Sequence, residues 1–147
     1  MHQLNQGLLL FAGSILLLLA TCQTPSINDS PRKLEILLLG HDSQHHISAA
    51  YLPLLAAALS SKGFNFSYTS DLDDLHADKL KMFDALMIYA NHDEITDAQE
   101  KALLQFVRRG GGLLPIHSAS NCFRNSDKYE RLVGGKFESL ETGAITV

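Results

Sequence analysis

The sequence predicts an α/β domain built on a doubly wound parallel sheet, and three observations lead to this fold class. Short apolar runs alternate with segments of helical periodicity along most of the chain. The runs are continuously apolar, which is typical of strands that are buried on both faces. The connections are long enough to hold helices, and right-handed crossovers of these lengths give the strand order 2-1-3-4. We therefore expect three layers, α/β/α.

The first half of this pattern contains two strands and two helices. Residues 34–40, LEILLLG, form the first predicted strand. Residues 47–62 carry apolar side chains at helical spacing and end at Gly63, which suits the left-handed conformation that terminates helices. Residues 64–69 alternate aromatic with polar side chains, as a second strand does. Spaced leucines then predict a short helix over residues 71–82.

The third strand is expected at residues 84–90, which are again mostly apolar. After it, Thr96 and Gln99 have the spacing of a capping box and predict the start of a helix over residues 97–109. The last two residues of that helix are arginines, whose positive charge is favourable at a helix carboxyl end. We therefore interpret these arginines as structural rather than phosphate-binding.

Residues 110–112 form a triple glycine that ends this helix. A triple glycine can form a phosphate-binding loop, but such a loop follows a strand and precedes a helix, and the order here is reversed. We therefore do not expect nucleotide binding. Residues 113–116 form the fourth predicted strand, in which Pro115 is tolerable only near a strand end. A short final helix is predicted over residues 127–133.

The amino-terminal part of the chain differs from the rest. Residues 8–20 are almost continuously apolar, too short to span a bilayer comfortably but suited to the core of a signal peptide. The Leu-Ala-Thr-Cys that follows resembles the lipobox of bacterial lipoproteins, so we expect residues 1–22 to be a lipoprotein signal peptide with lipidation at Cys22. Residues 23–32 would then be a tether. This predicts export and anchoring to a bacterial membrane, in the periplasm or at the cell surface, and a buried core helix is the alternative.

Composition and charge narrow the function further. The 147 residues carry a formal net charge of −4, and no basic run extends beyond Arg108 and Arg109, so we expect no nucleic acid partner. Of the two cysteines, only Cys122 remains free once Cys22 is lipidated, which leaves no internal disulfide. A single thiol without an identified base is more often inert than nucleophilic. We expect residues 33–147 to form one domain.

Five histidines follow the ends of predicted strands one, three and four, namely His41, His45, His46, His92 and His117. Because the carboxyl ends of parallel strands share one edge, we expect these side chains to meet in a crevice at the switch point between His41 and His92. The polar residues expected beside them are Asp42, Asn91, Asp93, Ser118 and Ser120. Such groups can serve as general acid and base, as metal ligands, or as hydrogen-bond partners of a polyhydroxyl ligand.

The chain resembles the trehalose-utilisation (ThuA-like) domain over about residues 34–142 in five ordered motifs, GHDSQHH, YANHDEIT, FVRRGGGLLPIHSAS, CFRNSDKY and LVGGKF. This resemblance implies a flavodoxin-like α/β domain within the class I glutamine amidotransferase-like superfamily. It also implies a link to sugar metabolism, with a small-molecule sugar as the partner, in bacterial proteins that are often secreted or lipid-anchored.

The sequence departs from these patterns at three places. The superfamily's amidotransferases carry a nucleophilic cysteine in a tight G-x-C-x-G turn, whereas residues 115–120 contain neither a cysteine nor flanking glycines, so we do not expect a glutaminase. Leu140 stands where the family pattern has a histidine. The chain also ends at Val147 whereas the family domain continues, so we expect an incomplete domain with its fourth strand near an uncovered edge.

The first hypothesis is an exported carbohydrate enzyme that uses His92 and His117 as acid and base on a sugar or oxidised sugar. Ser118 is a candidate nucleophile beside His117, although no acidic orienter is visible. A divalent metal held by some of the five histidines is also considered. Arg124 and Asn125 are expected to reach over the pocket and bind a carboxylate or sugar oxygens. The other hypotheses are a glycan-binding module without turnover and an inactive fragment, and the oligomeric state is not predicted.

Overall fold

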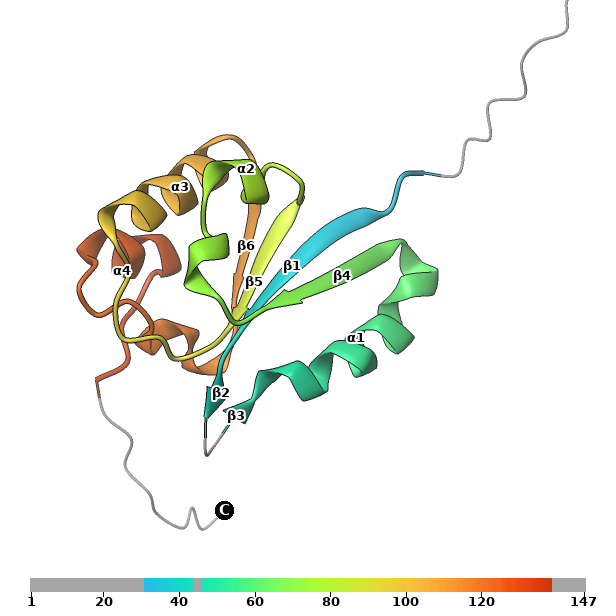
Figure 1. The fold of residues 1–147 in the computed structure, drawn as a ribbon, viewed down its shortest axis with the longest axis horizontal. Helices are drawn as coiled ribbons and strands as arrows, with labels where there is room; N and C mark the ends of the chain where they lie inside the picture. The colour runs from blue at the N-terminus through green and yellow to red at the C-terminus, as the bar shows by residue number, and fades with distance from the viewer. Residues whose placement is uncertain (1–30, 44–45, 139–147) are drawn as a thin grey trace, which may run out of the picture. The chain divides into compact units, whose positions relative to one another are not determined.

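The computed structural model describes residues 31–43 and 46–138, with only the backbone of His46. These residues belong to one unit of the chain, Pro31–Val147 (Figure 1). The predicted signal peptide with Cys22, all but the last two residues of the predicted tether, His45 and Leu140 lie outside the described residues. None of the helices in the described ranges is long and apolar enough to cross a membrane.

Four parallel strands form the central sheet in the order β4-β1-β5-β6. Their bounds are Leu34–Gly40 for β1, Phe64–Thr69 for β4, Ala85–Tyr89 for β5 and Gly112–Pro115 for β6. β1 lies inside the sheet, paired with β4 on one side and with β5 on the other, and β6 pairs with the far side of β5. The predicted doubly wound order 2-1-3-4 is therefore confirmed.

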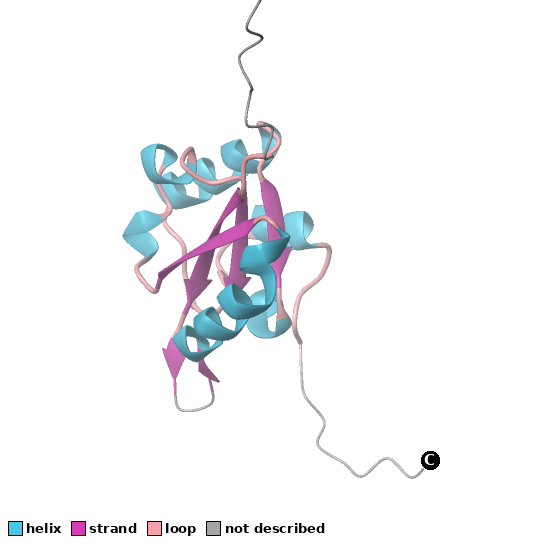
Figure 2. Ribbon diagram, turned by 90° about the vertical axis from the view of Figure 1, so that its right-hand side faces the viewer, coloured by secondary structure: helices cyan, strands magenta, loops and turns pink. Residues whose placement is uncertain are grey.

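Helices cover both faces of this sheet, as Figures 1 and 2 show. The bounds are Leu52–Leu59 for α1 on one face, and Ala77–Leu80 for α2, Asp97–Arg108 for α3 and Asp127–Val133 for α4 on the other. Successive side chains of a strand point to opposite faces. Leu37 and Leu39 therefore enter the core shared with α2, α3 and α4, whereas Ile36 and Leu38 enter the smaller core beneath α1. The three-layer, flavodoxin-like arrangement is confirmed.

The first predicted helix is not one continuous α-helix. It starts as a 3-10 turn, η1 at Ser48–Tyr51, continues as α1, and closes with a second 3-10 turn, η2 at Ser60–Lys62. Gly63 follows with a φ of 91°, the left-handed conformation that the sequence predicted for this position. α1 packs Leu52 and Leu55 toward the sheet but leaves Leu54 65% exposed, so it covers its face incompletely.

The second predicted helix is broken into two short pieces. A 3-10 turn, η3 at Leu72–Asp74, is separated from α2 by non-helical backbone at Leu75 and His76. The Asp71 carboxylate accepts the backbone N–H of Asp73 at 2.9 Å and so caps the start of η3. The ψ angles of 59° at Leu75 and 158° at His76 interrupt the helix. Leucine spacing alone did not reveal this interruption.

The third predicted helix begins as expected. The Thr96 hydroxyl accepts the N–H of Gln99 at 3.3 Å, and the Gln99 side-chain oxygen accepts the N–H of Thr96 at 3.0 Å. These two bonds are the predicted capping box at the start of α3. α4 has its own cap, because the Ser126 hydroxyl accepts the N–H of Tyr129 at 2.9 Å.

Two short regular elements at the carboxyl edge of the sheet were not predicted. β2, Asp42–Ser43, pairs antiparallel with β3, His46–Ile47, and a 3-10 turn, η4 at His117–Asn121, follows β6. Both elements are too short to produce a periodic pattern in the sequence. They nevertheless determine where the predicted site residues lie.

Candidate functional site

The histidines at the carboxyl edge come from the ends of three parallel strands. β1, β5 and β6 end at Gly40, Tyr89 and Pro115, and His41, His92 and His117 follow them within a few residues. The rings of His41 and His92 lie 5.0 Å apart between centroids, tilted by 49°. Two imidazoles separated by 51 positions in the sequence are thus neighbours at the switch point.

A hydrogen bond of His92 identifies which of its ring nitrogens carries the hydrogen. Its Nε2 lies 3.0 Å from the carbonyl oxygen of Gly40, and a carbonyl only accepts hydrogen bonds, so Nε2 carries the hydrogen. In the neutral ring, Nδ1 is then the atom that can accept a proton. Burial lowers the pKa of His92 below its ordinary 6.5, against a smaller raising effect of the Gly40 bond. His92 is therefore mostly neutral near pH 7.

His92 is also fixed by Phe123. The two rings are nearly parallel, 7° apart in plane and 6.4 Å apart between centroids, and the Phe123 N–H donates to the His92 carbonyl at 2.8 Å. Phe123 has a φ of 56°, an uncommon conformation for a bulky residue that the surrounding structure must enforce. Phe123 therefore holds His92 through a backbone hydrogen bond as well as through the contact between the two rings.

The Nδ1 atom of His41 is buried without a hydrogen-bond partner among the described residues. Buried polar side-chain atoms in native proteins nearly always have a partner, and leaving one unpaired costs about 1–3 kcal/mol. A ligand hydroxyl or an ordered water at this position would remove that cost. This atom is therefore the clearest indication in the described structure that the edge receives a polar group.

Ser48 connects the ends of β1 and β5. Its side chain is completely buried, and its hydroxyl accepts the N–H of His41 at 3.1 Å. The same hydroxyl lies 2.6 Å from the Tyr89 carbonyl and 3.0 Å from the His41 carbonyl, so its single hydrogen is donated to these acceptors. The sequence analysis missed Ser48, and its only signal was a serine at the start of a predicted helix.

His117 contacts Tyr89. The two rings meet edge to face at 5.9 Å, and Tyr89 meets Tyr51 in the same way at 5.2 Å. His117 is exposed and has a φ of 54°, a left-handed conformation that histidine adopts more readily than most residues. Backbone strain of this kind is concentrated at functional sites.

Several of the other predicted site residues bond to protein groups. The Ser118 hydroxyl donates to the Ala90 carbonyl at 2.9 Å, and the Asn121 amide donates to the Asn91 side-chain oxygen at 2.8 Å. The Asn125 side chain bonds to both the N–H and the carbonyl of Ile95, at 3.0 and 2.8 Å. These contacts hold the loops that follow β5 and β6.

The charged candidates lie at the surface. Arg124 forms a 3.3 Å ion pair with Asp93, in which both side chains are mostly exposed. Asp42, also exposed, is 3.5 Å from the Tyr68 hydroxyl, which donates to it. Ser120 and Arg124 border a cavity of only about 10 Å³, which is room for one water at most and not for a sugar.

A metal centre is not assembled by the part of the chain that the structure describes, where no three His, Cys, Asp or Glu side chains form a group that could hold an ion. Two of the candidate ligands, His45 and the side chain of His46, lie outside that part. The divalent metal therefore stays a prediction. Cys122 is buried, and burial raises the pKa of its thiol to about 11, so a reactive thiolate is disfavoured there.

The comparisons with known proteins agree with this fold. A ThuA-like protein from Bacteroides uniformis ATCC 8492 has a solved structure that is 23% identical with a TM-score of 0.51, covering 71% of this chain and 44% of that one. A ThuA-like protein from Parabacteroides merdae ATCC 43184 is 19% identical with a TM-score of 0.59, covering 73% of this chain and 40% of that one. The chain spans less than half the length of these structures, and at such identities the likeness shows the fold alone. No curated protein matches the sequence.

The family comparison covers more of the chain than the structural matches do. The ThuA family model, described as trehalose utilisation, matches residues 35–147. This range contains the described sheet except for Leu34, the first residue of β1, and it contains every histidine of the carboxyl edge. The chain belongs to the ThuA family.

Proposed function

We propose that this ThuA domain acts on a sugar or an oxidised sugar at the carboxyl edge of its sheet, with His92 and His117 as the base and the acid. The observation that carries the proposal is the contact between the His41 and His92 rings, with the unpartnered Nδ1 of His41 beside it. The family description, trehalose utilisation, supports a sugar as the substrate class.

The proposed division of roles follows from the surroundings of each imidazole. His92 is half-buried and mostly neutral near pH 7, with Nε2 occupied by Gly40, so Nδ1 can take a proton from a substrate hydroxyl. His117 is exposed just after β6, and we assign it the role of the acid. His41 Nδ1 would accept a hydrogen bond from a second hydroxyl and so orient the sugar.

The remaining predicted contacts belong to the same proposal. We propose that eight further residues border the substrate, namely Asp42, His45, His46, Asn91, Asp93, Ser120, Arg124 and Asn125. We also propose that the ligands of any divalent metal are among the five histidines. For Asn91 and Asn125 the bonds to protein groups favour an indirect role, in which they hold the loops around the substrate. Asp42 and Arg124 are the exposed groups best able to move onto a ligand.

Glycan binding without turnover is the second candidate function. Ser118, the candidate nucleophile, donates its hydroxyl hydrogen to the Ala90 carbonyl rather than to His117. A serine nucleophile needs a base within hydrogen-bond reach, and this geometry does not provide that pairing. The edge would then recognise hydroxyl groups without attacking a bond.

We also propose that the chain is exported and lipid-anchored through Cys22. The apolar run that ends in Leu-Ala-Thr-Cys supports this proposal. Expression with a radiolabelled fatty acid in a bacterial host should label the wild-type chain and not a Cys22→Ala variant. Equal labelling of both chains, or none in either, would contradict the anchor.

The test of the carbohydrate function compares three variants of the full chain. Trehalose, glucose and glucono-lactone serve as probes, with turnover followed by chromatography and binding by calorimetry, alongside metal analysis of the purified protein. Turnover that is lost in His92→Ala and His117→Ala but retained in His76→Ala, an exposed histidine at the start of α2, supports the enzyme.

The other outcomes are equally informative. Saturable binding without turnover, weakened by His41→Ala, supports the binding module instead. Neither binding nor turnover with any of the three probes, in a chain shown to be folded, contradicts both candidates and favours the inactive fragment.

A further inference from the structure

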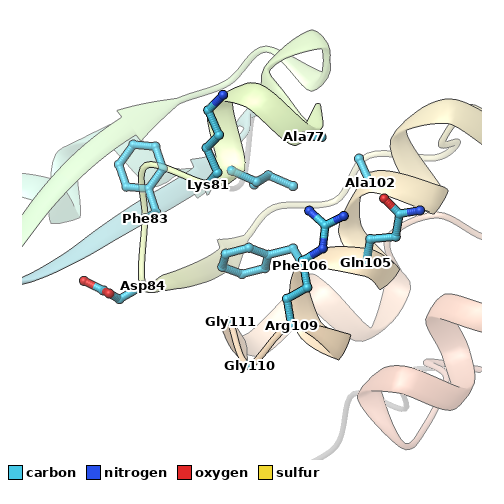
Figure 3. Close-up of a pocket in the computed structure, with 11 residues that line it drawn as sticks. Ala77, Lys81, Phe83, Asp84, Ala102, Gln105, Phe106, Arg109, Gly110 and Gly111 are labelled. Atoms are coloured by element: carbon cyan, nitrogen blue, oxygen red, sulfur yellow. The ribbon is translucent and has the colours of Figure 1, made fainter.

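A cavity of about 290 Å³ lies between α2 and α3, beside the amino ends of β5 and β6 (Figure 3). This is the edge of the sheet opposite to the histidines, so the cavity is not part of the site described above. Its volume is at the lower end of the roughly 300–1,000 Å³ that is usual for ligand pockets. The ligand that it could take is therefore small.

Gly110 and Gly111, the first two residues of the triple glycine, form one wall of this cavity. A Cβ atom on Gly111 would come within 2.5 Å of the Phe106 ring, so only glycine lets this ring lie against the turn. Gly110 has a φ of 97°, which also favours glycine. The turn after α3 therefore carries no side chains at Gly110 and Gly111. The Phe106 ring occupies the space that a side chain on Gly111 would fill.

One part of the cavity lining is apolar. Leu80 and Ala102 are buried, Phe106 is 8% exposed, and Phe83 is partly buried against the same core. All four side chains line the cavity. A ligand that fits here must have an apolar body, because polar groups facing these side chains would lose their hydrogen bonds to water.

Of the charged side chains that line the cavity, two form ion pairs with described residues and one does not. Lys81 pairs with Asp78 at 2.7 Å, and Asp84 pairs with Arg32 at 2.7 Å. Arg109 forms no ion pair with any residue in the described ranges, and Figure 3 shows its guanidinium beside Phe106 and Gln105 on the cavity side. One unmatched positive charge favours a ligand with a single negative charge.

We propose that this cavity binds a small monoanionic carboxylate with an aromatic or short aliphatic body. The carboxylate bonds to the planar fork of Arg109, which matches carboxylate geometry, and the Gln105 amide supplies a further donor. The apolar body packs between Phe83 and Phe106. From the sequence, both arginines were interpreted as structural. Under this proposal that interpretation holds for Arg108, which does not line the cavity, but not for Arg109.

The experiment uses phenylacetate as the probe and the full chain as the protein. Titration followed by amide NMR should give saturable shifts at Gly110, Gly111 and the residues around Phe83, and calorimetry should give the affinity. The neutral analogue 2-phenylethanol and the body-free anion acetate should each bind about tenfold more weakly or worse, since each lacks one of the two interactions.

Two variants on the same helix end make the test specific. Arg109→Ala should weaken phenylacetate binding by about tenfold or more, whereas Arg108→Ala, its exposed neighbour, should leave it unchanged. Circular dichroism checks that both variants are folded. The proposal is overturned if phenylacetate gives no saturable shifts, if 2-phenylethanol binds equally well, or if the two variants lose affinity alike.

This site stands apart from the proposed sugar function. His92→Ala and His117→Ala should bind phenylacetate like the wild type, because the histidines lie at the other edge of the sheet. A negative result in the sugar experiments therefore does not contradict the proposed carboxylate site. A negative phenylacetate titration likewise does not contradict the proposed sugar function.

Discussion

The two edges of the sheet hold their polar groups by different kinds of interaction. At the carboxyl edge, Ser48 and His92 are uncharged and bond to backbone groups. At the amino edge, Arg32 and Asp84 form a two-pronged ion pair, with both carboxylate oxygens at 2.7 Å from the guanidinium. The imidazoles lie at the first edge and the cavity of about 290 Å³ at the second. The imidazoles and this cavity thus lie at opposite edges of the sheet.

This difference implies different responses to solution conditions. Uncharged groups in a half-buried setting are insensitive to salt, but they are destabilised when an imidazole among them takes up a proton and its charge is buried. Ion pairs near the surface are screened by salt and lost when the carboxylate is protonated. The two edges should therefore lose stability in separate ranges of pH, and mutations at one edge should leave the other intact.

The largest effect is expected from Leu38→Asp, which disturbs both edges at once. Leu38 is 1% exposed in the middle of β1, and an unpaired charge there costs several kcal/mol, comparable with a total stability of about 5–15 kcal/mol. The variant should lose its cooperative urea transition and its dispersed NMR spectrum. Ser67→Asp, at an exposed position on the neighbouring strand, should keep both.

The next effect, Ser48→Ala, should be confined to the carboxyl edge. The variant leaves the His41 N–H and the Tyr89 carbonyl without their buried partner, which should lower the free energy of unfolding by about 1–3 kcal/mol. Hydrogen exchange should accelerate at the ends of β1 and β5 and stay unchanged around Asp84. Acceleration at both edges alike would show that the edges are coupled, and Ser67→Ala is the control.

A smaller effect should appear when His92 is titrated. Burial holds its folded-state pKa below the ordinary 6.5, so the unfolded chain takes up the proton more readily. The contribution of His92 to the free energy of unfolding is therefore fully present above pH 6.5. It is lost as the pH drops below 6.5 toward the folded-state pKa. Urea unfolding at about pH 7.5 and 5.5 should show this loss in the wild type and less of it in His92→Gln. An unchanged pH dependence in His92→Gln would assign the loss to another group.

The smallest effect should come from the ion pair at the amino edge, in a more acidic range. Arg32 and the N–H of Glu35 lower the pKa of Asp84 from 3.8 to about 2. The contribution of Asp84 is therefore present above pH 3.8 and is lost as the pH falls toward 2. The wild type should lose more stability than Asp84→Asn between about pH 5 and 3, and added salt should reduce the difference. Equal losses in the two proteins would mean that the ion pair contributes nothing measurable.

The predictions from sequence were most accurate where a few neighbouring residues decide the outcome. The bounds of β1 and β4, the capping box at Thr96 and the left-handed Gly63 were all predicted, because each depends on a local pattern of apolar, capping or glycine residues. The gathering of His41 and His92 followed from topology, since parallel strands end at one edge. The helix over residues 71–82 was predicted as one piece, whereas non-helical backbone at Leu75 and His76 divides it into η3 and α2.

The sequence by itself determined the fold class, the strand order and the edge at which the histidines lie. Only the tertiary structure decided the tautomer of His92, the unpartnered Nδ1 of His41 and the cavity beside Arg109. These features depend on pairs that are far apart in the chain, such as His92 with Gly40 at a separation of 52 residues, or Ser48 with Tyr89 at 41. Periodicity reports which face of an element is buried, whereas the atom that meets another across the fold is set by packing in three dimensions.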